Sequence, residues 1–316
     1  MPARVAIAAA TTIAAIVYAL IRRRQRRRLV LVARHPMPIV DACMDGTVLL
    51  DGERLVWFFR HGESLANAAG RLAMAADKAR DDGLDTERVQ HEVDMNFSDA
   101  ALTETGIAQA SARRADTASW RLRPEAIVTS PLTRALQTAA YIFADDLAAG
   151  TPLIVRPELR EYFPNLAQDR GRPLAALRAD PAIVALPNAA VILAALSDAA
   201  CADWRDEWDS WQACGDGWER HCGSAERVGA FKEWLLHAHP RLRRVATVSH
   251  FGTVNAFVNH EPCIEVSGLV RMPPEKIGIN AFAWRMGVLP PEGGVRVEMR
   301  NCGHVALVYS ERTVEE

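Results

Sequence analysis

The chain of 316 residues carries a formal net charge of −2; 49% of its residues are hydrophobic and 24% are charged. This is the balance of an ordinary globular protein, which excludes a disordered or fibrous chain. Arginines concentrate in the first 28 residues, so the remainder holds more acidic than basic residues. A nucleic-acid partner is therefore not expected, because contacts from basic residues to phosphate dominate such binding.

The first 28 residues differ from the rest of the chain. Residues 5–21 form an uncharged run rich in alanine, isoleucine and valine, and six arginines follow in residues 22–28. As a helix rising about 1.5 Å per residue, the run covers roughly 25 Å, near the short end of a membrane span. A secretory signal places its charges before the apolar run, and a transit peptide is amphipathic and rich in serine.

We therefore expect residues 1–28 to be a membrane anchor with a basic flank. The positive-inside rule then places the following domain, residues 29–316, in the cytosol. The alternative is a cleaved targeting segment, which would leave a soluble enzyme inside an organelle.

Three segments of this domain share one pattern: a short apolar run, a polar cluster and then helical periodicity. The apolar runs are residues 55–59, 126–129 and 245–248. Continuous apolar runs indicate strands buried on both faces, as in a parallel sheet covered by helices. The predicted fold class is α/β, a three-layer sandwich with a mostly parallel central sheet. Ligands bind beyond the carboxyl ends of such strands, so the polar clusters should meet at one edge.

Further elements complete the predicted domain. Residues 132–143 have helical spacing, with Ser130 as the expected N-cap and Pro131 as the first helical residue. Residues 153–155 predict a short strand that brings Glu161 to the same edge. Residues 295–299 and 305–309 alternate on either side of a turn, which predicts an antiparallel hairpin at the end of the sheet.

A helical insertion is expected at about residues 172–225. It is rich in alanine and leucine, and then places Trp204, Trp208 and Trp211 at helical spacing. The tryptophan stripe is expected to pack the insertion onto the main domain, with a substrate-facing lid as the alternative. The six cysteines include no CxxC pair, and their spacing matches no common zinc pattern, so no metal site is expected.

The polar clusters supply two histidines, His61 and His250, and two arginines, Arg60 and Arg134. A neutral imidazole is a nucleophile that can accept a phosphoryl group, and guanidinium groups match phosphoryl oxygens in shape and charge. A carboxyl group must still protonate the leaving oxygen, and Glu161 is the candidate. The chain has no Walker loop and no Gly-x-Ser-x-Gly elbow, which argues against nucleotide-driven kinase chemistry and a serine hydrolase.

Four segments, in this order, resemble the motifs of the histidine phosphatase superfamily, in the form shared with cofactor-dependent phosphoglycerate mutases. They are residues 59–67, 102–106, 130–139 and 248–252, and the resemblance covers roughly residues 55–309. It implies a mostly parallel sheet between layers of helices, a phosphorylated substrate, and neither a metal nor an organic cofactor.

The resemblance also implies the roles of individual residues. His61 is expected to be the nucleophile, and Arg60, Arg134 and His250 to complete the catalytic phosphate site. Glu161 inherits the role of proton donor, with Glu158 as the alternative. The residues expected to bind substrate are Gly62, Ser64, Asn67 and Gly252. Phe251 departs from the small or polar residue that usually follows the second histidine.

The expected function is hydrolysis of phosphomonoesters, either small molecules or phosphoproteins, through a phosphohistidine. A phosphoglycerate mutase and an inactive membrane-tethered scaffold on the same fold are the alternatives. Residues 162–165, Tyr-Phe-Pro-Asn, lack the tyrosine-glycine pattern that follows the corresponding acid in the mutases, which favours hydrolysis. Every matched catalytic position is filled, which argues against the scaffold.

Overall fold

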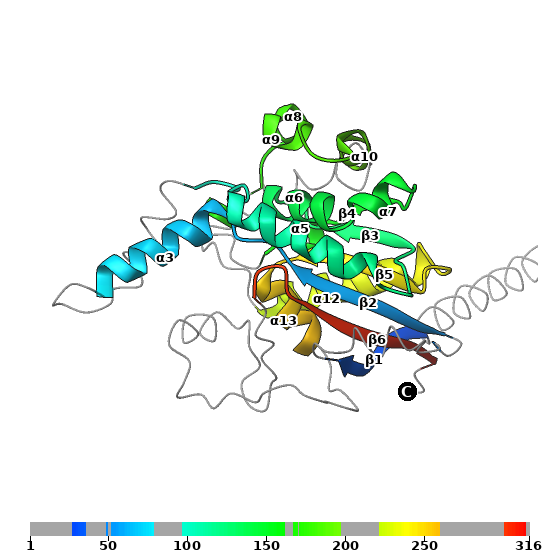
Figure 1. Cartoon of the computed structure of the whole chain (residues 1–316). Helices are drawn as coiled ribbons and strands as arrows, with labels where there is room; N and C mark the ends of the chain where they lie inside the picture. Colours follow the sequence, from blue (N-terminus) through cyan, green and yellow to red (C-terminus); the bar gives the residue numbers. More distant parts are fainter. Residues whose placement is uncertain are drawn as a thin grey trace, which may run out of the picture.

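The computed structural model of the chain describes residues 27–35, 49, 52–78, 97–161, 167–169, 171–196, 221–259 and 300–313. Its centre is a six-stranded sheet with strand order β1-β6-β2-β5-β3-β4 (Figure 1). The strands are β1 (Arg27–His35), β2 (Glu53–Arg60), β3 (Ala126–Thr129), β4 (Leu153–Val155), β5 (Arg244–Ser249) and β6 (His304–Thr313).

Four strands of this sheet are parallel. β2 pairs with β5, β5 with β3, and β3 with β4, while β6 runs antiparallel to both of its neighbours, β1 and β2. Three of them, β2, β3 and β5, are the strands predicted from continuous apolar runs, and β4 is the short strand predicted at residues 153–155; the four end at one edge. The predicted α/β class with a mostly parallel sheet is therefore confirmed.

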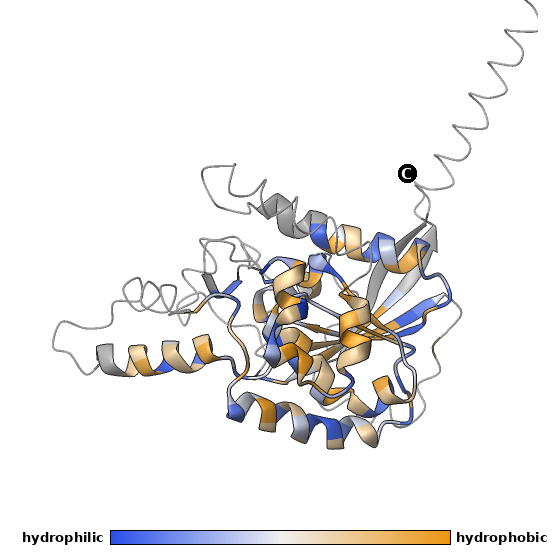
Figure 2. Ribbon diagram, turned by 90° about the horizontal axis from the view of Figure 1, so that it is seen from above, coloured by the Kyte–Doolittle hydropathy of each residue, from blue (hydrophilic) through white to orange (hydrophobic). Residues whose placement is uncertain are grey.

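Helices cover both faces of the sheet, because alternate side chains of each strand point to opposite sides. Leu55, Trp57 and Phe59 of β2 pack in one hydrophobic cluster with α5 (Glu104–Ala118), α6 (Thr133–Ile142) and α7 (Ala144–Ala148). Val56 and Phe58 pack on the other face with α12 (His221–His237) and α13 (Phe251–Asn259). The molecule is thus a three-layer sandwich, with the most hydrophobic residues of the strands between the helices (Figure 2).

One helix leaves the body of the sandwich. α3 (Leu65–Lys78) follows β2 and extends away from the sheet in both views (Figures 1 and 2). Its base is held by Glu63, which pairs with Arg71 and accepts a hydrogen bond from the hydroxyl of Thr103 at 3.0 Å. The short turns η1 (Pro157–Leu159) and η2 (Ala167–Asp169) lie between β4 and the next helices.

One prediction about an element boundary needs correction. α6 begins at Thr133 with Leu132 as its N-cap, so Ser130 is not the cap and Pro131 is not helical. Three residues, 130–132, separate the end of β3 from the start of α6, and the Ser130 hydroxyl contacts His250 instead. Arg27 and Arg28, assigned above to the basic flank, are the first residues of β1.

The second strand of the predicted terminal hairpin, residues 305–309, pairs with other strands than predicted. β6 contains residues 305–309 and lies between β1 and β2, so the edge of the sheet is β1. Residues 295–299, the predicted partner, lie outside the described residues.

Part of the expected insertion is described. It contains α8 (Leu174–Ala179), α9 (Pro181–Val184) and α10 (Ala189–Ala195), and buries Leu177, Ile183 and Ile192 in the same cluster as α6. The tryptophan stripe lies outside the described residues, as do residues 1–26 of the predicted anchor segment, residues 1–28. Among the helices that are described, none has the length and apolar character needed to cross a membrane.

Candidate active site

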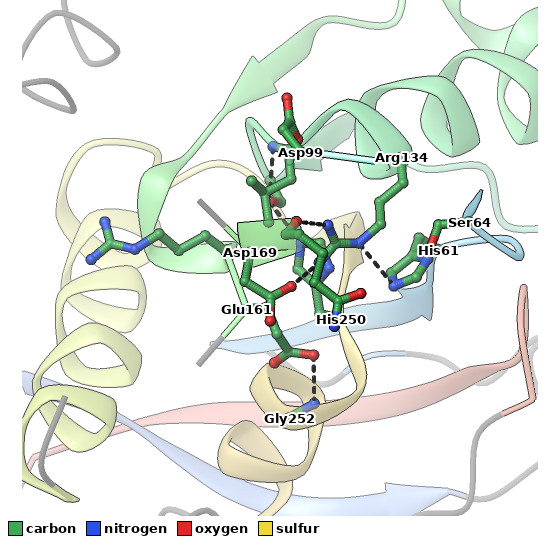
Figure 3. A network of polar contacts seen from close by, with 12 residues as sticks. His61, Ser64, Asp99, Arg134, Glu161, Asp169, His250 and Gly252 are labelled. Atoms are coloured by element: carbon green, nitrogen blue, oxygen red, sulfur yellow. Dashed lines mark hydrogen bonds and ion pairs between the residues drawn. The ribbon is translucent and has the colours of Figure 1, made fainter. Parts of the chain in front are cut away.

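The predicted residues meet beyond the carboxyl ends of the parallel strands (Figure 3). His61 directly follows β2, His250 directly follows β5, and Arg134 lies in the first turn of α6, after β3. Glu161 follows β4 and η1. The rings of His61 and His250 are tilted toward each other with centroids 5.1 Å apart. Four loops that are distant in sequence thus build one cluster.

The hydrogen bonds of His61 indicate where its proton lies. Nδ1 is 2.6 Å from the carbonyl oxygen of Gly62, which can only accept. Nε2 accepts a hydrogen bond from Nε of Arg134 at 3.2 Å. The proton is therefore on Nδ1, and Nε2 carries the lone pair that faces the arginine.

Both histidines are neutral in this cluster. His61 and His250 are buried, and burial lowers the pKa of each well below its ordinary value. The positive charge of Arg134 lowers both pKa values further, and Arg60 acts in the same direction. A buried, uncharged imidazole beside two guanidinium groups is a nucleophile that does not first need to lose a proton.

Arg60, the last residue of β2, places its guanidinium 5.6 Å from the ring centroid of Phe251. Burial lowers the pKa of Arg60, and the negative charge of Glu161 opposes this shift. Phe251, the unusual residue after the second histidine, therefore provides a flat apolar surface for the guanidinium.

Glu161 and Glu158 have different surroundings. The carboxylate of Glu161 accepts hydrogen bonds from the backbone N–H groups of Gly252 and Thr253, each at 3.2 Å, at the N-terminus of α13. Glu158 instead forms a bidentate pair with Arg156. Glu161 is thus held against the loop of His250, whereas the carboxylate of Glu158 is bound by an arginine at the end of β4.

The residues expected to bind substrate lie in the loop after His61 and in the first turns of α3 and α13. The N–H of Gly62 donates to the hydroxyl of Thr138 at 3.0 Å, and the N–H of Gly252 donates to Glu161. Ser64 and Asn67 bind each other across the first turn of α3: each backbone N–H donates to the other side chain, at 3.3 and 3.2 Å. In this structure Ser64 and Asn67 cap a helix.

Sequence reasoning missed two acidic residues beside Arg134. Asp169 of η2 forms an ion pair with Arg134 at 2.5 Å, and both side chains are 3% exposed. Asp99 accepts hydrogen bonds from the backbone and hydroxyl of Thr133, and pairs with Arg172 at 2.9 Å. Neither aspartate lies in a recognisable motif. Only the tertiary structure brings them to the start of α6, where Asp169 pairs with Arg134 and Asp99 binds the preceding residue, Thr133.

Taken together, the cluster offers a neutral nucleophile, two guanidinium groups and a carboxylate beside a second histidine. Such a set can hold an oxyanion and form a bond from imidazole nitrogen to its central atom. The positive ends of α6 and α13 face the same edge and add to the attraction for an anion.

Comparison with known proteins gives a family match within the domain. The family model described as "Histidine phosphatase superfamily (branch 1)" matches residues 86–180. This range contains Arg134 and Glu161, while the two histidine motifs lie on either side of it. No curated protein matches the chain.

Similar solved structures include three enzymes that differ in name. A mycobacterial glucosyl-3-phosphoglycerate phosphatase is 19% identical, with 81% of this chain and 90% of that chain covered and a TM-score of 0.39. A phosphoserine phosphatase from Entamoeba histolytica is 15% identical, with 83% and 98% covered and a TM-score of 0.37. A phosphoglycerate mutase from Bacillus anthracis is 14% identical, with 83% and 93% covered and a TM-score of 0.39.

The family match covers the segment of the second arginine and the candidate acid, and the four motifs occur in the family's order. Residues 86–180 of the chain are therefore similar to the histidine phosphatase superfamily, whose members hydrolyse or transfer phosphoryl groups.

Proposed function

We propose that this protein hydrolyses phosphomonoesters through a phosphohistidine formed on Nε2 of His61. The observation that carries the proposal is the tautomer of His61. Its Nδ1 proton is held by the carbonyl of Gly62, which leaves the Nε2 lone pair beside the Arg134 guanidinium. A lone pair held next to the buried Arg134, with Arg60 nearby, is suited to attack the phosphorus of an anionic ester.

The first step forms the N–P bond. Phosphoryl oxygens bind Arg60, Arg134 and the N–H groups of the site, and draw the Arg134 guanidinium away from Nε2. The lone pair then attacks phosphorus as the bond from phosphorus to the ester oxygen breaks. Glu161 in its protonated form gives its proton to that oxygen, so an alcohol leaves.

The second step restores the enzyme. The carboxylate of Glu161 takes a proton from a water molecule, whose oxygen attacks phosphorus while the N–P bond breaks. Inorganic phosphate is released, and His61 recovers its lone pair. The position of Glu161, which accepts two backbone hydrogen bonds at the start of α13, supports this role for it rather than for Glu158, whose carboxylate is paired with Arg156.

The test is the variant His61→Ala in the full chain, assayed with a panel of phosphate esters. Turnover should fall at least about a thousandfold, equivalent to about 4 kcal/mol of transition-state stabilisation. Rapid quenching of the wild type should trap phosphate that is labile in acid and stable in base. His237→Ala is a matched control, since His237 lies at the end of α12 and pairs with Glu233. Near-normal turnover of His61→Ala would disprove the proposal.

We further propose that water, rather than a second substrate hydroxyl, is the usual acceptor. A mutase must protect its phosphohistidine from water and hold a small acid tightly. The absence of the mutase tyrosine-glycine pattern after Glu161 supports hydrolysis. The rate of phosphate release should exceed the rate of interconversion of 3- and 2-phosphoglycerate; the opposite ratio would identify a mutase.

For the N-terminus we propose a membrane anchor at residues 5–21 with the catalytic domain on the cytosolic side. The six arginines that follow the run support this orientation, because carrying each through a bilayer core costs roughly 2.5–3.5 kcal/mol on insertion scales. The protein should resist alkaline carbonate extraction and be cleaved by protease added to intact organelles. Its release into the soluble fraction would favour a cleaved targeting segment instead.

A further inference from the structure

Ser130 lies within the active-site cluster, although no role was predicted for it beyond helix capping. It follows β3 directly, and both Ser130 and His250 are fully buried. The Ser130 hydroxyl oxygen is 2.8 Å from Nε2 of His250. The hydroxyl therefore contacts the second histidine from the side of the sheet, while His61 approaches from the neighbouring loop.

The direction of this hydrogen bond follows from the other contacts of Ser130. The hydroxyl oxygen accepts a hydrogen bond from the backbone N–H of Leu132 at 3.2 Å. Among the residues that the structure describes, the one group in contact with the hydroxyl that can accept its hydrogen is Nε2 of His250. A buried hydroxyl that leaves its hydrogen unbonded loses free energy, so the hydrogen is expected to point at Nε2.

This direction determines the tautomer of His250. Because the imidazole is neutral, one ring nitrogen accepts and the other carries hydrogen. If Nε2 accepts from Ser130, the hydrogen is on Nδ1. Within the described part of the chain Nδ1 of His250 is buried and has no hydrogen-bond partner. A buried N–H donor with no partner costs free energy unless a ligand satisfies it.

We propose that Ser130 is a positioning residue: its hydroxyl donates to Nε2 of His250 and keeps the hydrogen on Nδ1, where it donates to a phosphoryl oxygen. This rests on the proposed function, because the phosphoryl group is the acceptor. The hydrogen bond from Ser130 makes His250 a neutral hydrogen-bond donor through Nδ1 over the physiological pH range. His61 has the opposite arrangement: its Nε2 carries the lone pair that attacks phosphorus.

The two histidines are thus assigned different tasks by different partners. The carbonyl of Gly62 binds the Nδ1 hydrogen of His61, so the Nε2 lone pair of His61 faces the substrate. The hydroxyl of Ser130 binds Nε2 of His250, so the Nδ1–H of His250 faces the substrate. With the other tautomer of His250, a lone pair would face the phosphoryl oxygens and repel them.

The direct test is NMR spectroscopy of the full chain labelled with ¹⁵N-histidine, with His250 assigned by comparison with His250→Gln. Wild-type His250 should show a protonated Nδ1 and an unprotonated Nε2, unchanged between about pH 6 and pH 8. Addition of inorganic phosphate should shift the Nδ1–H resonance. A protonated Nε2 in the wild type would overturn the proposal, whatever the variants do, and so would an Nδ1–H resonance that saturating phosphate leaves unmoved.

The second test uses variants of the hydroxyl. Ser130→Ala should give a mixture of both His250 tautomers and lower kcat by about tenfold, the scale of one lost hydrogen bond, while Ser130→Thr, which keeps the hydroxyl, should retain the wild-type tautomer. Thr247→Val is the matched control: Thr247 on β5 is equally buried and its hydroxyl donates to the backbone carbonyl of Trp57. A Ser130→Ala protein that keeps both the single tautomer and the full kcat contradicts the proposal.

Failure of the proposal for Ser130 can be distinguished from failure of the proposed function. Loss of the phosphohistidine or survival of activity in His61→Ala would refute nucleophilic catalysis by His61, whereas the tautomer of His250 is read without any turnover.

Discussion

At the scale of single residues, Glu158 and Glu161 are three positions apart, but their carboxylates bind different groups. The carboxylate of Glu161 lies on backbone N–H groups of the His250 loop, and that of Glu158 is bound by Arg156. A proton donor must reach the leaving oxygen beside the nucleophile, which only the first arrangement supports.

We therefore predict that Glu161→Gln lowers kcat for an alkyl phosphate by about a hundredfold or more, because the alkoxide then leaves without a proton. The loss should be smaller for a nitrophenyl phosphate, whose leaving group needs little protonation. Glu158→Gln is the matched control and should leave the ratio of the two substrates unchanged. Steady-state kinetics with both esters measure this ratio. If kcat instead falls more for the alkyl ester than for the nitrophenyl ester in Glu158→Gln, Glu158 is the proton donor.

At the scale of elements, the loop of His61 is held by contact between two backbones. A Cβ atom on Gly62 would lie 2.7 Å from the carbonyl oxygen of Gly106, and one on Gly106 would lie 2.1 Å from the carbonyl oxygen of Glu63. The N-terminus of α5 thus packs directly on the residues that follow His61. Backbone atoms cannot move aside as a flexible side chain can, so both positions require glycine.

Gly106→Ala should therefore lower the free energy of unfolding by about 1–3 kcal/mol, the range of overpacked cores, and lower kcat by displacing the His61 loop. Gly229→Ala provides the control: in α12 its Cβ would meet no atom within 4 Å, and this variant should gain about 0.5–1 kcal/mol from helix propensity. Urea denaturation of both variants measures whether the unfolding free energy falls in Gly106→Ala and rises in Gly229→Ala. Equal stability of Gly106→Ala and wild type would mean that α5 is not packed on the loop.

At the scale of the whole molecule, three buried histidines link folding to pH. Burial lowers the pKa values of His61 and His250 well below normal, and lowers the pKa of His304 to about 4. The unfolded chain, whose histidines titrate near 6.5, then binds more protons than the folded chain as the pH falls below about 6.5. Stability is therefore complete above that pH and is lost progressively toward pH 4.

His304 supplies a measurable share of this effect. Its ring stacks on Phe59 with centroids 4.8 Å apart, and its lowered pKa corresponds to about 3 kcal/mol of unfolding free energy lost by pH 4. His304→Phe keeps an aromatic ring and removes the titration, so its unfolding free energy should decline less steeply between pH 6.5 and 4. Denaturation curves at several pH values test this, and parallel pH profiles for the two proteins would exclude a contribution from His304.

The sequence by itself determined the parts of this protein that depend on local pattern. Apolar runs at residues 55–59, 126–129 and 245–248 predicted parallel strands, since only a strand buried on both faces is apolar without alternation. The carboxyl ends of parallel strands meet at one edge, and this alone predicts that His61, Arg134 and His250 lie together. The roles of these residues stay predictions.

Only the tertiary structure decided the features that rest on contacts between distant segments. The pairing of Arg134 with Asp169, the contact of Ser130 with His250 and the insertion of β6 between β1 and β2 join residues 35, 120 and more than 200 positions apart. No local periodicity encodes such partners, because hydrogen bonds and ion pairs depend on where the whole chain places two groups. The start of α6 shows the same limit: Ser130 has the chemistry of a helix cap, and burial against His250 gave its hydroxyl another partner.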